Sequence, residues 1–423
     1  MNVFSYLEPA CRRNLLVLFA SGLLFWSSLA ALLPTLSLYI KHVGGTNHQV
    51  GIVMGSFAVG LVLFRPWVGR LADQRGRKIV LLIGLVAVAI APIGYLLTQS
   101  IPLLMAVRAF HGLSIAAFTT AYSALVVDLS PEQSRGELIG YMSLVNPVGV
   151  AIGPALGGFL QEWAGYTPLF LLAAGLGGAG LVCAFQVVAP SVSSQLKEVE
   201  AAGKPSRLAK EKGFWQLVTS PRLRIPTLVM LLIGLAFGTL ITFVPLFIQE
   251  TRVNFNAGLF YTAAAISSFA VRLPTGRASD RYGRGLFITI SLGFYTTAML
   301  LISIAQSATV FLLAGLIEGA GAGILIPMMI ALVADRSVPQ ERGRVFGLCM
   351  AGFDLGMAIA GPILGYFADQ IGYRELFRQA GILAFLALVI FVSQCSKDFS
   401  HSIKFALGRG RDLYALPQTG HHS

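Results

Sequence analysis

Long apolar runs, each about as long as one membrane-spanning helix, alternate with short polar segments along the whole chain. The runs are continuous, without the alternation of a barrel strand, so they predict helices that cross a lipid bilayer. We expect twelve spans, with the bounds 14–40, 48–68, 78–98, 101–123, 137–160, 167–189, 224–247, 257–275, 285–305, 309–333, 344–366 and 376–395. The first run is too long for the apolar core of a cleaved signal peptide, so we expect it to remain as a span.

The chain also repeats itself. The charged turn Gly69–Lys78 returns 207 residues later as Gly276–Gly285, and the same offset pairs Asp128 with Asp335. A duplicated six-span segment is typical of membrane transporters built from two parallel repeats. We therefore predict an all-α membrane protein with twelve transmembrane helices in two pseudo-symmetric six-helix bundles. The expected parts are a first bundle at 1–190, a linker at 191–223, a second bundle at 224–396 and a cytoplasmic tail at 397–423.

The composition is typical of a protein that is embedded in a lipid bilayer. Of 423 residues, 55% are hydrophobic and 12% are charged, and the mean hydropathy is +0.74; soluble domains carry about 25% charged residues. The net charge of +12 arises from Lys and Arg in alternate connecting segments, which is the positive-inside pattern and predicts that both termini are cytoplasmic. We expect no nucleic-acid partner and, from four scattered cysteines, no metal site.

Three motifs together resemble the major facilitator superfamily. Gly69–Lys78 resembles its loop between helices 2 and 3, with Gln74 where Arg is usual. The segment around Arg108 resembles the helix-4 motif whose Arg is associated with proton coupling, with His111 where Gln is usual. Residues 149–158 resemble the helix-5 motif of drug/proton antiporters. The resemblance covers residues 12–395 and implies a monomeric transporter of a small molecule, not an enzyme.

The resemblance implies contacts between the bundles at the cytoplasmic face. Asp73 is expected at the start of helix 11, where free N–H groups and the helix dipole favour an anion, and Asp280 at the start of helix 5. Such contacts exist only while this side is closed, so they would bias alternating access. The expected gating residues are Gly69, Asp73, Arg77, Gly276, Asp280, Arg284, Arg342 and Arg344. The alternative is that these charges only anchor a cytoplasmic turn.

The helix-5 motif leaves one helical face without side chains. Gly149, Gly153 and Gly157 recur every four residues, and Gly158 follows. This face permits close packing, for which we expect helix 8 at the seam between the bundles, and Pro154 can kink the helix. Packing of small residues without any special role is the alternative.

Four ionisable residues are expected deep in the membrane, where a charge costs about 2.5–3.5 kcal/mol on insertion scales. They are the candidates for proton coupling or substrate binding: Arg108, His111, Glu318 and Asp354. His111 and Glu318 occupy equivalent repeat positions. Alternatives are a hydrogen-bonded core role for His111, anion binding or structural pairing for Arg108, and pairing at the seam for Asp354. Aromatic candidates for a pocket are Phe25, Trp26, Phe237, Phe243 and Phe247.

These features predict export of a small organic or amphipathic solute in exchange for protons, with the proton gradient as energy source and no cofactor. The location would be a bacterial inner membrane. The first helix lacks the acidic residue that some multidrug antiporters carry there. Two alternatives are proton-linked uptake of a sugar or organic anion, and a membrane sensor that does not transport. The basic tail, with Lys404, Arg409 and Arg411, either contacts anionic lipid or is a disordered end.

Overall fold

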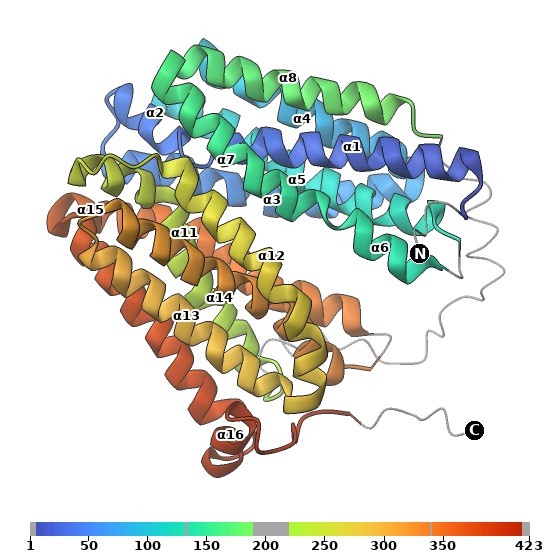
Figure 1. Cartoon of the computed structure of the whole chain (residues 1–423), viewed down its shortest axis with the longest axis vertical. Helices are drawn as coiled ribbons and strands as arrows, with labels where there is room; N and C mark the ends of the chain where they lie inside the picture. The colour runs from blue at the N-terminus through green and yellow to red at the C-terminus, as the bar shows by residue number, and fades with distance from the viewer. Residues whose placement is uncertain (1–5, 132–133, 189–219, 339–340, 417–423) are drawn as a thin grey trace. The chain divides into compact units, whose positions relative to one another are not determined.

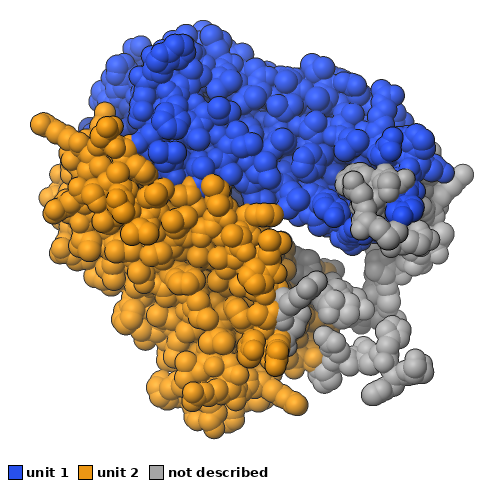
Figure 2. Space-filling view, viewed as in Figure 1, with its two compact units in different colours: residues 1–210, 256–262 blue, residues 211–255, 263–423 orange. Residues whose placement is uncertain are grey.

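The computed structural model describes residues 6–131, 134–188, 220–338 and 341–416. Helices are the only regular elements in these ranges (Figure 1). The chain divides into two compact units, shown in two colours in Figure 2: residues 1–210 with 256–262, and residues 211–255 with 263–423. Most of the expected linker, up to residue 219, lies outside the described residues.

The helices follow the apolar runs closely, because spanning length and hydropathy are local properties of the sequence. In the first unit they are α1 Pro9–Ala31, α2 Leu36–His42, α3 Asn47–Arg75, α4 Arg77–Leu97, α5 Ile101–Leu129, α6 Arg135–Met142, α7 Val145–Ala164 and α8 Tyr166–Phe185. The helices that follow the linker are α11 Arg224–Thr251, α12 Ala257–Tyr282, α13 Arg284–Ile304, α14 Ala308–Asp335, α15 Arg342–Gln394 and α16 Phe399–Ala406.

Ten stretches of the described helices are long and apolar enough to cross a membrane. One of them, in α15, is divided by Gly372, whose φ of 75° and ψ of 168° are not helical. The two parts of α15 and the 26-residue α12 bring the spans to the twelve that the sequence predicts. The prediction of an all-helical membrane protein is confirmed.

The turns between spans repeat with the sequence. Gly165, between α7 and α8, has a φ of 85° and is the repeat equivalent of Gly372. Gly76, between α3 and α4, has a φ of 91°, and its equivalent Gly283, between α12 and α13, has 87°. These dihedrals are open to glycine at little cost and are rare for other residues. The duplication therefore extends to backbone conformation.

One helix crossing is repeated as well. Gly112 of α5 lies against the Phe57 carbonyl of α3, so closely that a Cβ atom at Gly112 would collide with backbone. In the second unit Gly319 of α14 lies against the Ala264 carbonyl of α12 in the same way. Both members of the second pair stand 207 residues after those of the first. Glycine allows such close contact, which stabilises helix packing within lipid.

The expected partner of the helix-5 glycines is wrong. Gly149, Gly153 and Gly157 of α7 lie against α1, where added Cβ atoms would meet residues 26–31. Other residues of the motif do face the start of α12 within the first unit: Gly158 lies against Asn256, and the Pro154 carbonyl lies against Gly258. Thr262 also donates a hydrogen bond to the Ala151 carbonyl at 2.7 Å. The spacing of the glycines identified a bare face correctly, but spacing alone does not say which helix covers it.

Candidate functional site

A buried polar cluster lies in the first unit at the position of the helix-4 motif. Arg108 and His111 lie one turn apart on α5, with 6% and 0% of their surface exposed. His111 Nδ1 lies 3.1 Å from the Tyr95 hydroxyl of α4 and 3.5 Å from Nη1 of Arg108. The Arg108 guanidinium also lies 4.4 Å from the centroid of the Phe57 ring of α3, a cation–π contact. Three helices therefore position one buried cation.

This cluster keeps free hydrogen-bonding capacity. Arg108 Nε and His111 Nε2 are both buried and have no hydrogen-bond partner among the described residues. A buried polar atom without a partner costs free energy, so such atoms usually mark a place for water, an ion or a ligand. The arrangement is compatible with both alternatives for Arg108, which are binding of an anion and structural pairing.

The second unit carries an acid at the equivalent position. Glu318 of α14 is 3% exposed, and its Oε1 has no hydrogen-bond partner within the described ranges. It interacts electrostatically with Tyr295 of α13, which in turn interacts with Arg272 of α12. His111 and Glu318 each precede the glycine of a repeated crossing, so the backbone fixes both positions. The fourth candidate, Asp354 in the first part of α15, is 7% exposed.

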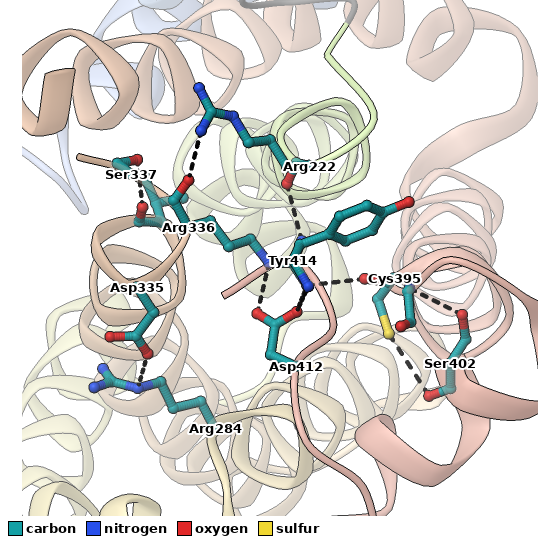
Figure 3. Close-up of polar contacts among 11 residues, drawn as sticks. Arg222, Arg284, Asp335, Arg336, Ser337, Cys395, Ser402, Asp412 and Tyr414 are labelled. Atoms are coloured by element: carbon teal, nitrogen blue, oxygen red, sulfur yellow. Dashed lines mark hydrogen bonds and ion pairs between the residues drawn. The ribbon is translucent and has the colours of Figure 1, made fainter. Parts of the chain in front are cut away.

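The charged turns form ion pairs that the sequence did not predict. Arg77 at the start of α4 pairs with Asp128 at the end of α5. Its repeat equivalent Arg284 pairs with Asp335 of α14 at 2.7 Å, as Figure 3 shows. The sequence did contain a signal for these pairs, because Arg284 follows Arg77 and Asp335 follows Asp128 by the same offset of 207 residues. The sequence predicts these arginines as gating residues or as anchors of a cytoplasmic turn, whereas the structure shows that each joins two helices of its own unit.

The other gating candidates are only partly described. The side chains of Asp73, Asp280 and Arg342 lie outside what the structure describes, and Arg344 is exposed. An added Cβ atom at Gly69 or Gly276 would meet no atom within 4 Å. Neither glycine therefore stands at a close crossing within its own unit, and the latch between bundles stays a prediction.

A cavity of about 270 Å³ opens in the first unit. Its wall contains Trp26 of α1, Phe118 and Tyr122 of α5, Met142 of α6 and Asn146 of α7, and none of the described lining residues is charged. Of the aromatic candidates, Trp26 thus lines a cavity. Phe25 does not, because it is buried and stacks on Phe118 with ring centroids 3.8 Å apart.

Two of the three aromatic candidates on α11 also belong to the core, whereas Phe237 is only partly buried. Phe243 and Phe247 are fully buried, and Phe247 packs against Phe311 and Phe377. Aromatic residues on apolar helices look alike in sequence whether they face a pocket or a core, so this distinction required the structure.

Comparison with known proteins decides the family. The family model of the Major Facilitator Superfamily matches residues 17–277 and 253–397. The chain belongs to this superfamily. It is therefore a multi-pass membrane transporter and not an enzyme, and the predicted two-bundle fold is confirmed.

Individual relatives agree with this assignment. Multidrug resistance protein MdtG of Escherichia coli O6:K15:H31 is 26% identical over 395 residues, which covers 89% of this chain and 93% of the relative. The crystal structure of the nucleoside transporter NupG has a TM-score of 0.75 at 15% identity and covers 89% of this chain. A POT family transporter in complex with a thioalcohol-conjugated peptide has a TM-score of 0.71 at 15% identity and covers the same share of this chain and 95% of its own. These two structural similarities concern the fold alone.

Proposed function

We propose that this superfamily member exports small apolar or amphipathic organic solutes across the bacterial inner membrane in exchange for protons, with both termini in the cytoplasm. The observation that carries the proposal is Glu318, a carboxyl group buried in the span equivalent to that of His111. The likeness to multidrug resistance protein MdtG supports efflux as the direction. The proton gradient would be the energy source, and no cofactor is required.

Glu318 suits a proton carrier because of its surroundings. A carboxyl group favours its neutral form when buried and its ionised form when water or a cation reaches it. Alternating access would move Glu318 between these environments, since one conformation seals the group and the other hydrates it. Release of the proton on one side and uptake on the other then couples solute export to proton entry.

The uncharged aromatic cavity of the first unit supports the solute class. Trp26, Phe118 and Tyr122 offer large apolar surfaces, while the Asn146 amide can orient a polar group of the solute. A lining without carboxylates gives no counter-charge for a strongly cationic drug. We therefore expect neutral or weakly basic aromatic solutes to be better substrates than permanent cations.

Purified protein in liposomes with an imposed pH gradient tests the proposal. We expect export-direction transport of neutral aromatic compounds that collapses when the gradient is dissipated. Glu318→Gln should abolish gradient-driven transport yet retain solute binding, whereas Glu162→Gln, an exposed carboxylate at the end of α7, should transport normally. If Glu318→Gln and Asp354→Asn both retain gradient-driven transport, the coupling scheme is wrong.

Uptake of an organic anion is the second candidate, because Arg108 is a buried cation whose Nε atom has no hydrogen-bond partner in the described part of the chain. The same liposomes distinguish the two functions. Anion uptake would show inward transport together with protons, and Arg108→Gln would raise the KM for anions. Export of neutral solutes would survive competition by anions.

A further inference from the structure

A second cavity, of about 810 Å³, lies in the second unit far along the chain from the candidate site. Its wall is formed where α12 ends, α13 begins, α14 ends and the tail after α16 folds back. These are ends of spans, so the cavity lies at the level of the membrane surface. No step of the proposed transport cycle uses it.

The tail forms a fixed wall of this cavity. Thr289 of α13 donates a hydrogen bond to the Ala406 carbonyl at 2.9 Å, and the Leu416 amide donates to the Asp335 carbonyl at 2.9 Å. Gly408, with a φ of 71°, lies against the Tyr282 carbonyl, where a Cβ atom would come within 2.6 Å. The basic tail is therefore ordered up to residue 416, contrary to a disordered end.

The charges of the wall are unbalanced. Four arginines and two aspartates line the cavity, and both aspartates are already paired. Arg284 holds Asp335, and Arg336 holds Asp412 through bonds of 2.7 and 3.0 Å (Figure 3). The remaining cations, Arg281, Arg409 and Arg411, line the cavity without an ion-pair partner among the described side chains. Three arginines from two segments thus line one space.

We propose that this cavity binds a phosphate group, presented by the headgroup of an anionic phospholipid. Guanidinium groups bind phosphate oxygens through paired, charge-assisted hydrogen bonds. The neighbouring tail helix favours lipid as the source, since Phe399 and Leu407 are 65% and 45% exposed beside basic residues, as in segments that lie at a membrane surface. A free phosphate ion offers the same chemistry from water.

The test uses the full-length protein in detergent. It is titrated with short-chain phosphatidylglycerol or phosphatidylcholine, and separately with inorganic phosphate or chloride at constant ionic strength, and binding is read from the shift of the unfolding temperature. We expect phosphatidylglycerol to bind in clear preference to phosphatidylcholine. Arg281→Gln/Arg411→Gln should weaken this binding at least about tenfold, because each lost charge-assisted contact is worth about that much.

Matched variants make the result specific. Arg12→Gln/Arg13→Gln removes two exposed arginines of the first unit and should leave the affinity within about twofold, while Arg281→Lys/Arg411→Lys should retain part of it. If inorganic phosphate alone protects wild type and the Gln variant abolishes this, the site holds and its ligand is a free phosphate. The site would be overturned if Arg12→Gln/Arg13→Gln lost as much affinity as Arg281→Gln/Arg411→Gln. It would also be overturned if the wild type preferred neither phosphatidylglycerol over phosphatidylcholine nor inorganic phosphate over chloride.

Discussion

Two residues that the duplication makes equivalent carry opposite chemistry. His111 and Glu318 stand at the same place in their spans, and each is followed by a glycine that touches a neighbouring backbone carbonyl. The crossing fixes the backbone while the side chain is free to differ. His111 has the buried cation Arg108 as neighbour, whereas Glu318 provides an acid. At the residue scale, the repeat fixes the two positions, and the differences between the halves provide the asymmetry that the proposed proton coupling would use.

Gly157 offers a sharp test of packing at this scale. A Cβ atom there would collide with the Ala31 carbonyl of α1, so Gly157→Ala must push α1 and α7 apart. We expect it to lower the unfolding temperature in detergent and to slow transport. Gly178→Ala on α8, where an added Cβ meets no atom within 4 Å, should be neutral or slightly stabilising, since alanine favours a helix by about 0.5–1 kcal/mol over glycine. Equal behaviour of the two variants would contradict the close crossing.

At the scale of elements, each unit ties its charged turn to the end of a neighbouring span. The Arg77–Asp128 and Arg284–Asp335 pairs are partly exposed, with side chains 15–32% accessible. Partly exposed pairs contribute about 1 kcal/mol or less, so their main effect is to hold the helix ends in register. The duplication preserved both the arginine and the aspartate of the pair, so both recur 207 residues later in the sequence.

A double-mutant cycle on Arg77 and Asp128 measures this contribution. Arg77→Gln and Asp128→Asn should each lower stability, and the double variant should cost less than the sum, with a coupling energy of about 0.5–1 kcal/mol. Reversal of both charges, Arg77→Asp with Asp128→Arg, should recover part of the loss. Strict additivity of the two single variants would show that the pair contributes nothing.

The second unit contains a contact network that has no counterpart among the described residues of the first. Arg336 is fully buried and donates to the Arg222 carbonyl before α11, the Cys395 carbonyl after α15 and the Asp412 carboxylate of the tail. Its repeat equivalent in the first unit is Leu129. Arg336 therefore joins three spans and the tail (Figure 3).

Loss of the acid should be costly here, because it leaves a buried cation unpaired. We expect Asp412→Asn to destabilise the second unit by about 3 kcal/mol and to speed hydrogen exchange in α16. Arg336→Met/Asp412→Met should recover most of this stability, since an apolar pair avoids the desolvation cost of two charges. Asp398→Asn, which alters the tail helix but not this network, serves as the control. Unchanged stability of Asp412→Asn would mean that the two carbonyl acceptors suffice for Arg336.

At the scale of the whole molecule, the sequence predicted what is local and missed what is distant. The spans predicted at 78–98 and 285–305 are observed as Arg77–Leu97 and Arg284–Ile304, because hydropathy acts within each run. The partner of Asp128, the helix that covers Gly157 and the burial of Arg336 were not predicted. Each depends on which helices become neighbours, and the local patterns of a single sequence do not specify the neighbours of a helix.

The repeated turns lead to a prediction for the transport cycle. We propose that Asp73 stabilises the closed cytoplasmic side through a helix N-terminus of the other unit, so that Asp73→Asn shifts the protein toward inward-facing states. An anion at a helix N-terminus contributes about 0.3–1 kcal/mol, which corresponds to a shift of about two- to fivefold.

A reporter cysteine at Ser123, an exposed residue of the first-unit cavity, should then react faster with a water-soluble maleimide, in a background without the native cysteines. Arg75→Gln removes a charge from the same turn, at a position that we expect only to anchor it, and should leave the rate unchanged. Equal rates in wild type and Asp73→Asn, or equal acceleration in both variants, would assign these charges to the turn alone.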